Sequence, residues 1–139
     1  MKSNITVRAH DGLAPVHAAA QEGHLECLKY LLSHKGTEIL SADSATPGHF
    51  AASQGHVECL RWLLGNRIIT GHEVDVYDST IVHDAAEGGQ LEVLKLLYKR
   101  GVDFSAKNED KCTPLDIVVK NEHKECVAFM KNPDAIVKK

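Results

Sequence analysis

The feature that most constrains this 139-residue chain is a short phrase that occurs four times. The copies begin at Ala14, Thr46, Thr80 and Thr113, and the fourth residue of each is His17, His49, His83 or Asp116. Between these fourth residues the spacings are 32, 34 and 33 residues. Such a period predicts stacked units, because one short unit cannot bury its own apolar face.

Each copy is followed by a second phrase, and the two phrases together predict one helix-turn-helix unit. Threonine before proline, as at Thr46 and Pro47, favours a helix start, because threonine caps the helix and proline loses no hydrogen bond there. Glycine tolerates the backbone conformations that end a helix, and Gly23, Gly55 and Gly89 stand at the predicted turns. The second helices carry apolar residues at helical spacing, for example Leu25, Leu28, Leu31 and Leu32.

The period of about 33 residues and the Thr-Pro-x-His phrase are similar to those of ankyrin repeats. We therefore expect an all-α dominated fold, an ankyrin-repeat solenoid of about four helix-turn-helix repeats with β-hairpin fingers between them. The predicted divisions are an N-terminal stub (1–8), four repeats (9–40, 41–74, 75–107 and 108–131) and a C-terminal tail (132–139). The fourth repeat is the predicted C-terminal cap.

Two residues depart from the repeat pattern. Gly48 stands where the pattern has leucine, which predicts a shallow packing defect in the second repeat. Asp116 stands where the pattern has histidine, which predicts a looser last repeat, as suits a terminal cap.

Composition limits the possible functions. The net charge of −3 is too small to indicate binding to nucleic acid or to an anionic membrane. No apolar run approaches the roughly 18 residues of a membrane span, and the N-terminus lacks the apolar stretch of a signal peptide. We therefore expect a cytoplasmic monomer without nucleic-acid or membrane partners.

The four cysteines are expected to be reduced thiols and not a disulfide framework. Cys27, Cys59 and Cys126 share one slot of the second helices, which Val93 fills in the third repeat. A thiol that exchanges with valine is a packing residue. Cys112, in a finger, is the only thiol that we expect to be accessible.

Nine histidines could indicate a metal or catalytic site, but their positions favour structural roles. The histidines of the first phrase are expected to tie a finger to a helix start through backbone hydrogen bonds. His24, His56 and His123 fall in the turns between helices. The sequence has no ligands at zinc spacing, no nucleophile elbow, no phosphate loop and no His-Glu-x-x-His motif. We therefore predict no enzymatic activity, no metal and no cofactor.

In ankyrin stacks the fingers and first helices line a concave face, so the resemblance implies that variable residues there contact a partner protein. The predicted partner-binding residues are Asp11, Leu13, Gln21, Glu22, Asp43, Phe50, Ser53, Gln54, Tyr77, Asp84, Glu87, Asp110, Ile117 and Lys120. Acids outnumber bases, which predicts a negative groove with Phe50 as its aromatic anchor. The alternatives are that Phe50 packs against the neighbouring finger, that Tyr77 shields its hairpin, and that the acids are an ordinary solvated surface.

Several phrases also resemble the ankyrin array of the espins, among them those at 17–21, 49–53 and 62–64, and the resemblance runs from about Val7 to about Met130. Espins are actin-bundling proteins whose ankyrin repeats bind the tails of class III myosins. The resemblance implies a scaffold at the actin cytoskeleton that binds a basic, apolar, myosin-tail-like segment. The alternatives are a free-standing ankyrin inhibitor or adaptor that covers an enzyme or a transcription factor, and a regulatory domain fused to an enzyme.

Overall fold

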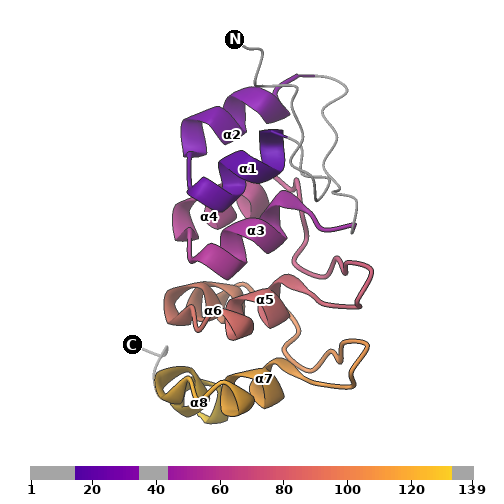
Figure 1. Ribbon diagram of the computed structural model, residues 1–139. Coiled ribbons are helices and arrows are strands. Elements are labelled where there is room, and N and C mark those ends of the chain that lie inside the picture. The colour runs from indigo at the N-terminus through magenta and orange to yellow at the C-terminus, as the bar shows by residue number, and fades with distance from the viewer. Residues whose placement is uncertain (1–14, 35–43, 133–139) are drawn as a thin grey trace.

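The computed structural model describes residues 15–34 and 44–132, and these residues form helices joined by loops. The helices are α1 (Pro15–Glu22), α2 (Leu25–Leu32), α3 (Pro47–Gln54), α4 (Val57–Gly65), α5 (Ile81–Glu87), α6 (Leu91–Lys99), α7 (Pro114–Lys120) and α8 (Lys124–Lys131). They form four helix-turn-helix pairs, stacked one on another (Figure 1). The expected solenoid is confirmed, and these pairs are repeats one to four below.

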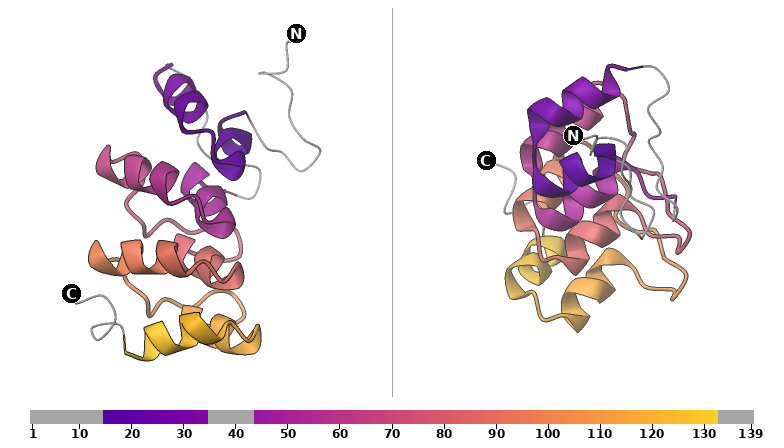
Figure 2. Two further views of the ribbon diagram at one scale, coloured as in Figure 1. Left: turned by 90° about the vertical axis from the view of Figure 1, so that its left-hand side faces the viewer. Right: turned by 45° about the horizontal axis from the view of Figure 1, so that its top comes forward.

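The stack has two layers. The first helices of the pairs (α1, α3, α5 and α7) contact one another in order, and so do the second helices (α2, α4, α6 and α8), as Figure 2 shows. Contacts are more extensive in the first layer. Ala20, Ala52 and Ala86 occupy one position of the repeat there and are 0% exposed. Small side chains let helices approach closely, so alanine brings the first helices together.

The first helices of repeats two, three and four begin at a capping threonine, as the sequence predicts for Thr46 and Thr113. Thr80 Oγ1 accepts a hydrogen bond from the His83 backbone N–H at 3.3 Å, and His83 Nδ1 accepts one from the Thr80 backbone N–H at 3.1 Å. Thr46 and Thr113 head the same reciprocal arrangement in repeats two and four. Backbone donors that a helix start would leave unpaired are thereby satisfied.

The turns inside the pairs contain glycines in the left-handed region. Gly55 has a φ of 80°, and Gly23 and Gly89 have φ values of 75° and 67°. A side chain would be strained at such an angle, and a Cβ at Gly89 would also stand 2.7 Å from His123 Nδ1. The glycines therefore end the first helices and leave room for the next repeat.

Two rows of hydrogen bonds join neighbouring repeats. In the first row, His49 Nε2 donates to the Ser79 carbonyl at 3.0 Å and His83 Nε2 donates to the Cys112 carbonyl at 2.9 Å. In the second row, the side chains of the turns donate to the end of the preceding first helix: His56 Nε2 to the Gln21 carbonyl (2.9 Å), Gln90 Nε2 to the Ser53 carbonyl (3.0 Å) and His123 Nε2 to the Glu87 carbonyl (3.1 Å). The predicted structural role of these histidines is confirmed.

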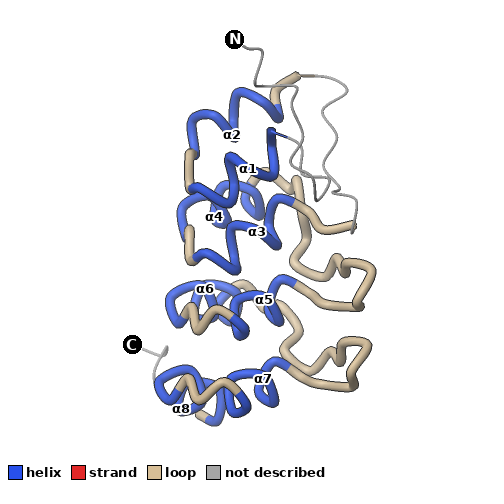
Figure 3. Tube along the Cα trace, in the orientation of Figure 1, coloured by secondary structure: helices blue, strands red, loops and turns tan. Residues whose placement is uncertain are grey.

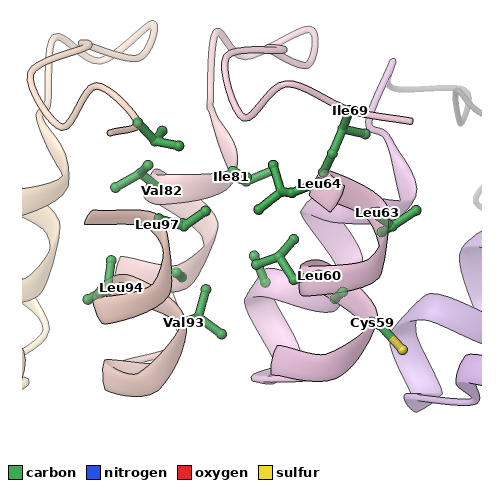
Figure 4. Packing of buried hydrophobic residues seen from close by; sticks show 14 of the residues in the cluster. Cys59, Leu60, Leu63, Leu64, Ile69, Ile81, Val82, Val93, Leu94 and Leu97 are labelled. Carbon is green, nitrogen blue, oxygen red and sulfur yellow. The ribbon is translucent and has the colours of Figure 1, made fainter. Parts of the chain in front are cut away.

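The hydrophobic core lies between the two layers and continues from repeat to repeat (Figure 4). Leu60 and Leu63 of α4 and Leu94 and Leu97 of α6 are fully buried in it. Burying a leucine side chain contributes roughly 1.5–3 kcal/mol. Each repeat therefore depends on its neighbour to cover its apolar face.

The loops between the pairs project from one side of the stack as fingers (Figure 3). The described residues contain no β-strand, so the expected β-hairpins are not confirmed. In repeat three a side chain closes the finger instead. Asp75 Oδ1 accepts hydrogen bonds from the backbone N–H groups of Tyr77 (2.8 Å) and Ser79 (3.0 Å). Aspartate commonly makes such turns, which reverse the chain without a strand ladder.

The packing defect expected at Gly48 is absent, because Ile69 fills the space. A Cβ at Gly48 would collide with Ile69 Cδ1, and the Ile69 side chain is only 2% exposed. The loop that carries Ile69 has 15 residues between α4 and α5, one more than the loop between α6 and α7. Ile69 of the following loop thus takes the place of the leucine side chain that repeat two lacks.

The start of the last repeat is not loosened by Asp116, contrary to expectation. The Asp116 carboxylate accepts a hydrogen bond from the Thr113 backbone N–H at 3.0 Å, and Thr113 Oγ1 accepts one from the Asp116 N–H at 3.2 Å. The bond from the Thr113 backbone lowers the pKa of Asp116 below its ordinary value. A carboxylate cannot donate to a carbonyl, however, so Asp116 caps its own helix without offering a donor to a following finger.

The expectation that Cys112 is the only accessible thiol is wrong, because Cys27 is exposed. Cys59 and Cys126, in the same slot of repeats two and four, are each 2% exposed, and burial raises the pKa of both thiols. Figure 4 shows Cys59 directed toward repeat one. Among the described residues no helix precedes repeat one, so the same slot is open at Cys27.

We predict that Ile69→Ala destabilises the fold by about 2–5 kcal/mol, because it opens a cavity beside Gly48. In a Gly48→Leu background the same change should cost much less, since the leucine would fill that space. Urea unfolding of the four proteins measures both costs. Ile68→Ala, at a partly buried neighbour, is the control and should cost the same in both backgrounds. Equal costs for Ile69→Ala would show that Ile69 does not replace the leucine.

The second prediction concerns His49, whose ring must be neutral because its Nδ1 accepts a hydrogen bond from the Thr46 N–H at 3.0 Å. Burial lowers the pKa of His49, although the Ser79 carbonyl and Asp75 raise it in part. The pKa in the unfolded chain is about 6.5. The unfolded state therefore binds more protons just below that pH. Stability is complete above about pH 6.5 and is lost as the pH falls toward the folded pKa.

We therefore predict that the free energy of unfolding falls more steeply for the wild type than for His49→Gln between about pH 7.5 and pH 5.5. Glutamine keeps an acceptor and a donor but does not titrate. Urea denaturation at each pH gives the two profiles, and His24→Gln, at an exposed turn, is the matched control. Parallel profiles for wild type and His49→Gln would rule out this coupling.

Candidate protein-binding face

The first helices and the fingers form one face of the stack, which we call the concave face. The first helices contact one another more extensively than the second helices do. The tips of two fingers are joined directly, because the Glu109 backbone N–H donates to the Tyr77 carbonyl at 2.8 Å. Helices and fingers together therefore hold the side chains of this face in fixed positions.

Ten of the predicted partner-binding residues lie on this face with accessible side chains. Six are exposed and four are partly exposed: Glu22, Gln54, Tyr77, Glu87, Asp110 and Lys120 in the first group, and Gln21, Phe50, Ser53 and Asp84 in the second. Asp11, Leu13 and Asp43 lie outside the described residues. The structure thus brings together the greater part of the predicted set, and its contact with a partner stays a prediction.

Ile117 was expected on this face, but it belongs to the core. Its side chain is 7% exposed and packs with the buried residues of the first layer. The corresponding residues of repeats two and three are Phe50 and Asp84. An apolar side chain in this slot is stabilised by folding down onto the core, whereas burial of a polar one is costly. We therefore remove Ile117 from the accessible set.

Phe50 packs against His17 in the first helix of repeat one, and its contact with a partner stays a prediction. Its ring lies 5.3 Å from the ring of His17, at an interplanar angle of 52°, and His17 is 0% exposed. The Phe50 ring therefore packs over repeat one. The remainder of the ring is accessible on the concave face, where it can meet an apolar group of a partner.

Among the described acids of the concave face, Asp84 has the most strongly shifted pKa. Burial raises the pKa of Asp84 well above its ordinary value, and the nearby Asp75 and Glu87 carboxylates raise it further. The Asp84 carboxyl therefore retains its proton at a higher pH than a solvated aspartate does. A cation placed beside it would favour the charged form and displace that proton.

The described acids of the concave face form no ion pairs with described bases. Within the described part of the chain, the ion pairs lie on second helices: Lys29 with Glu26 (3.6 Å), Arg61 with Glu58 (2.9 Å) and Lys95 with Glu92 (3.5 Å). Glu22, Glu87 and Asp110 form none there. These carboxylates are exposed. The negative partner-binding groove stays a prediction.

Three exposed finger residues escaped the sequence analysis. Val74 and Val76 are 45% and 52% exposed, and Asp78 is also exposed. They lie beside Tyr77, which is 49% exposed. The repeat motif carries no information about them, because it describes the helices. An alignment of successive fingers, residue by residue, would have found them.

The described residues contain neither a metal-binding cluster nor a membrane-spanning helix. No group of three or more histidine, cysteine, aspartate or glutamate side chains in the described ranges could hold a metal ion. None of the helices of residues 15–34 and 44–132 is long and apolar enough to cross a membrane.

Comparison with protein families decides what this architecture is. Two ankyrin-repeat family models match the chain: one described as "Ankyrin repeats (3 copies)" over residues 1–78, and one described as "Ankyrin repeats (many copies)" over residues 82–130. The chain belongs to the ankyrin-repeat family. Ankyrin repeats bind other proteins, so the chain is a protein–protein interaction module. Its first helices and fingers carry exposed side chains on one face of the stack.

Similar proteins carry the repeat in different settings. The human Espin-like protein is 35% identical over 57 residues, which are 41% of this chain and 6% of that protein. Ankyrin repeat and SOCS box protein 11 of Danio rerio is 30% identical over 112 residues, 78% of this chain and 37% of that protein. The human Ankyrin repeat and IBR domain-containing protein 1 is 36% identical over 69 residues, 45% of this chain and 6% of that protein. The chain therefore spans well under half the length of these relatives.

We predict that Asp84→Asn stabilises the fold at neutral pH. A carboxyl whose folded pKa is raised binds more protons in the folded state, so its contribution to stability falls as the pH rises from about 3.9 through the folded pKa. The gain from asparagine should therefore be largest at neutral pH and shrink as the pH falls. Thermal unfolding of both proteins across this range measures it, and Glu22→Gln, at an exposed helix end, is the control. A gain that grows on acidification would show that the Asp84 pKa is not raised.

Proposed function

We propose that this chain is a non-catalytic module that binds a basic, apolar segment of a partner protein on its concave face. The observation that carries the proposal is the set of exposed carboxylates without basic partners, next to partly open aromatic rings. Lysine or arginine side chains of a partner would neutralise Glu22, Glu87 and Asp110. A large apolar side chain of the same segment would cover the open part of Phe50.

Charge and apolar contacts contribute differently to such binding. An exposed ion pair is worth about 0–1 kcal/mol, but several together accelerate encounter and are screened by salt. A desolvated aromatic contact acts mainly on dissociation. Asp84 would also respond to binding. Burial raises its pKa in the free protein, and a cation bound beside it would favour the charged carboxylate.

The nature of the partner follows from resemblance. The likeness to the espins supports a myosin-tail-like segment, of class III myosins in particular, and a scaffold in the cytoplasm at the actin cytoskeleton. The similarity to the human Espin-like protein, over 41% of this chain, is in keeping with it. In this proposal the chain acts as a monomer, because one concave face is enough to hold one segment.

The experiment is a calorimetric titration of a synthetic class III myosin-tail peptide into the wild type and two variants. We predict that Phe50→Ala weakens binding by about 2 kcal/mol. Asp84→Lys/Glu87→Lys should weaken it strongly and reduce its salt dependence. Because Phe50 packs on His17, the thermal stability of each variant is measured first. The matched control is Glu58→Lys/Glu92→Lys, which reverses two charges on the second helices and should leave affinity unchanged.

Equal affinities for the wild type and both concave-face variants would show that this face is not the binding site. Binding that fails with every basic peptide but occurs with an intact folded target would favour the inhibitor or adaptor alternative. An isolated peptide can bind only if its own side chains make the contacts that determine affinity.

A further inference from the structure

The fingers of repeats three and four have the same backbone but different side chains. Asn108 in repeat four does what Asp75 does in repeat three: its Oδ1 accepts hydrogen bonds from the N–H groups of Asp110 (2.9 Å) and Cys112 (3.0 Å). The residue that ends the turn is left-handed in both, with φ values of 60° at Asp78 and 66° at Lys111. The two turns are therefore equivalent at an offset of 33 residues.

This equivalence shows which side chains the finger requires. Repeat three has Val74, Val76 and Tyr77 where repeat four has Lys107, Glu109 and Asp110. The same turn forms in repeat four with charged residues at these positions. The apolar residues of repeat three are therefore not needed to form the turn. We call Val74, Val76 and Tyr77 the finger patch.

The finger patch is an unusual concentration of exposed apolar surface. The large apolar side chains that are exposed in the described residues are Tyr30, Val74, Val76, Tyr77 and Val119. Three of the five thus lie within four consecutive residues of a single finger. Isolated apolar residues are common on protein surfaces, but clusters of them mark interaction sites.

The surroundings of the finger patch are acidic. The two finger segments, residues 73–78 and 107–111, carry five carboxylates and two lysines. Asp78, Glu109 and Asp110 are exposed. The hydrogen bond from the Glu109 N–H to the Tyr77 carbonyl fixes the two tips to each other. A partner therefore meets an already ordered surface, apolar on one finger and acidic around it, and binding loses little entropy to ordering.

We propose that the finger patch is the apolar anchor for a partner segment in which a large apolar residue is flanked by lysine or arginine. The inference rests on the proposed function and adds Val74 and Val76, beside Tyr77, to the proposed contact residues of the concave face. The apolar residue of the partner covers Val74, Val76 and Tyr77. Its basic neighbours lie against Asp78, Glu109 and Asp110.

The structure supplies a variant that removes the patch and keeps the turn. Val74→Lys/Val76→Glu/Tyr77→Asp gives finger three the residues that finger four carries at the same backbone positions. We therefore expect a melting temperature close to that of the wild type. The matched control is Lys107→Ala/Lys111→Ala, which alters finger four and leaves both the patch and the acids in place.

The probe is a random peptide library displayed on phage, selected on the wild-type chain, from which single peptides are synthesised. We expect the selected peptides to combine lysine or arginine with a large apolar residue. Their affinity should fall about tenfold or more in the finger-patch variant, as expected for loss of a hot spot. The Lys107→Ala/Lys111→Ala control should bind as well as the wild type or better.

Each other outcome is decisive. Basic, apolar peptides that bind the finger-patch variant as tightly as the wild type, but lose affinity for Phe50→Ala or Asp84→Lys/Glu87→Lys, overturn the inference and leave the proposed function intact. Selected peptides that lack basic residues, or that bind all of these variants equally, overturn the proposed function and the inference with it.

Discussion

Contact between neighbouring repeats is the constraint on which the rest of this structure depends. A repeat of about 33 residues cannot bury its own apolar face and must pack against its neighbours. Its first helix therefore carries alanine where the first helix of the next repeat packs against it. The same contact positions the fingers, because His49 and His83 hold them through the Ser79 and Cys112 carbonyls. The proposed recognition surface inherits its rigidity from the stack, since these two fingers are each tied to the first helix of the repeat before them.

Much of the fold could be predicted because its signals are local. Capping threonines, turn glycines and histidine positions each act within a few residues, and they recur at one period. The exceptions depend on contacts between distant residues. Ile69 fills the space at Gly48 from 21 positions away in the chain, and no pattern in a single repeat records that. Cys27 occupies the slot of Cys59, but its exposure is decided by what covers the slot.

The candidate site was less predictable for a related reason. Position in the repeat indicates which residues face the groove, but the character of the side chain decides whether it stays there. Ile117 folded onto the core, whereas Asp84 in the same slot remained partly accessible, because burying an aspartate costs more than burying an isoleucine. The repeat motif does not include the exposed finger residues. Val74 and Val76 became visible as unusual only when the equivalence of the two turns was established.

This separation between backbone and side chain explains how one fold can hold different partners. The turn of a finger is specified by an aspartate or asparagine and one left-handed residue, so its other positions are free to vary. The same holds for the slot occupied by Phe50 and Asp84, which lies outside the capping and hydrogen-bonding positions. Asp84 also shows that this freedom has a cost, since a half-buried carboxyl beside Asp75 and Glu87 opposes folding. A stack can carry such a residue because its stability comes from many repeated contacts. Strongly shifted pKa values gather at functional sites, so Asp84 is a candidate contact for a partner.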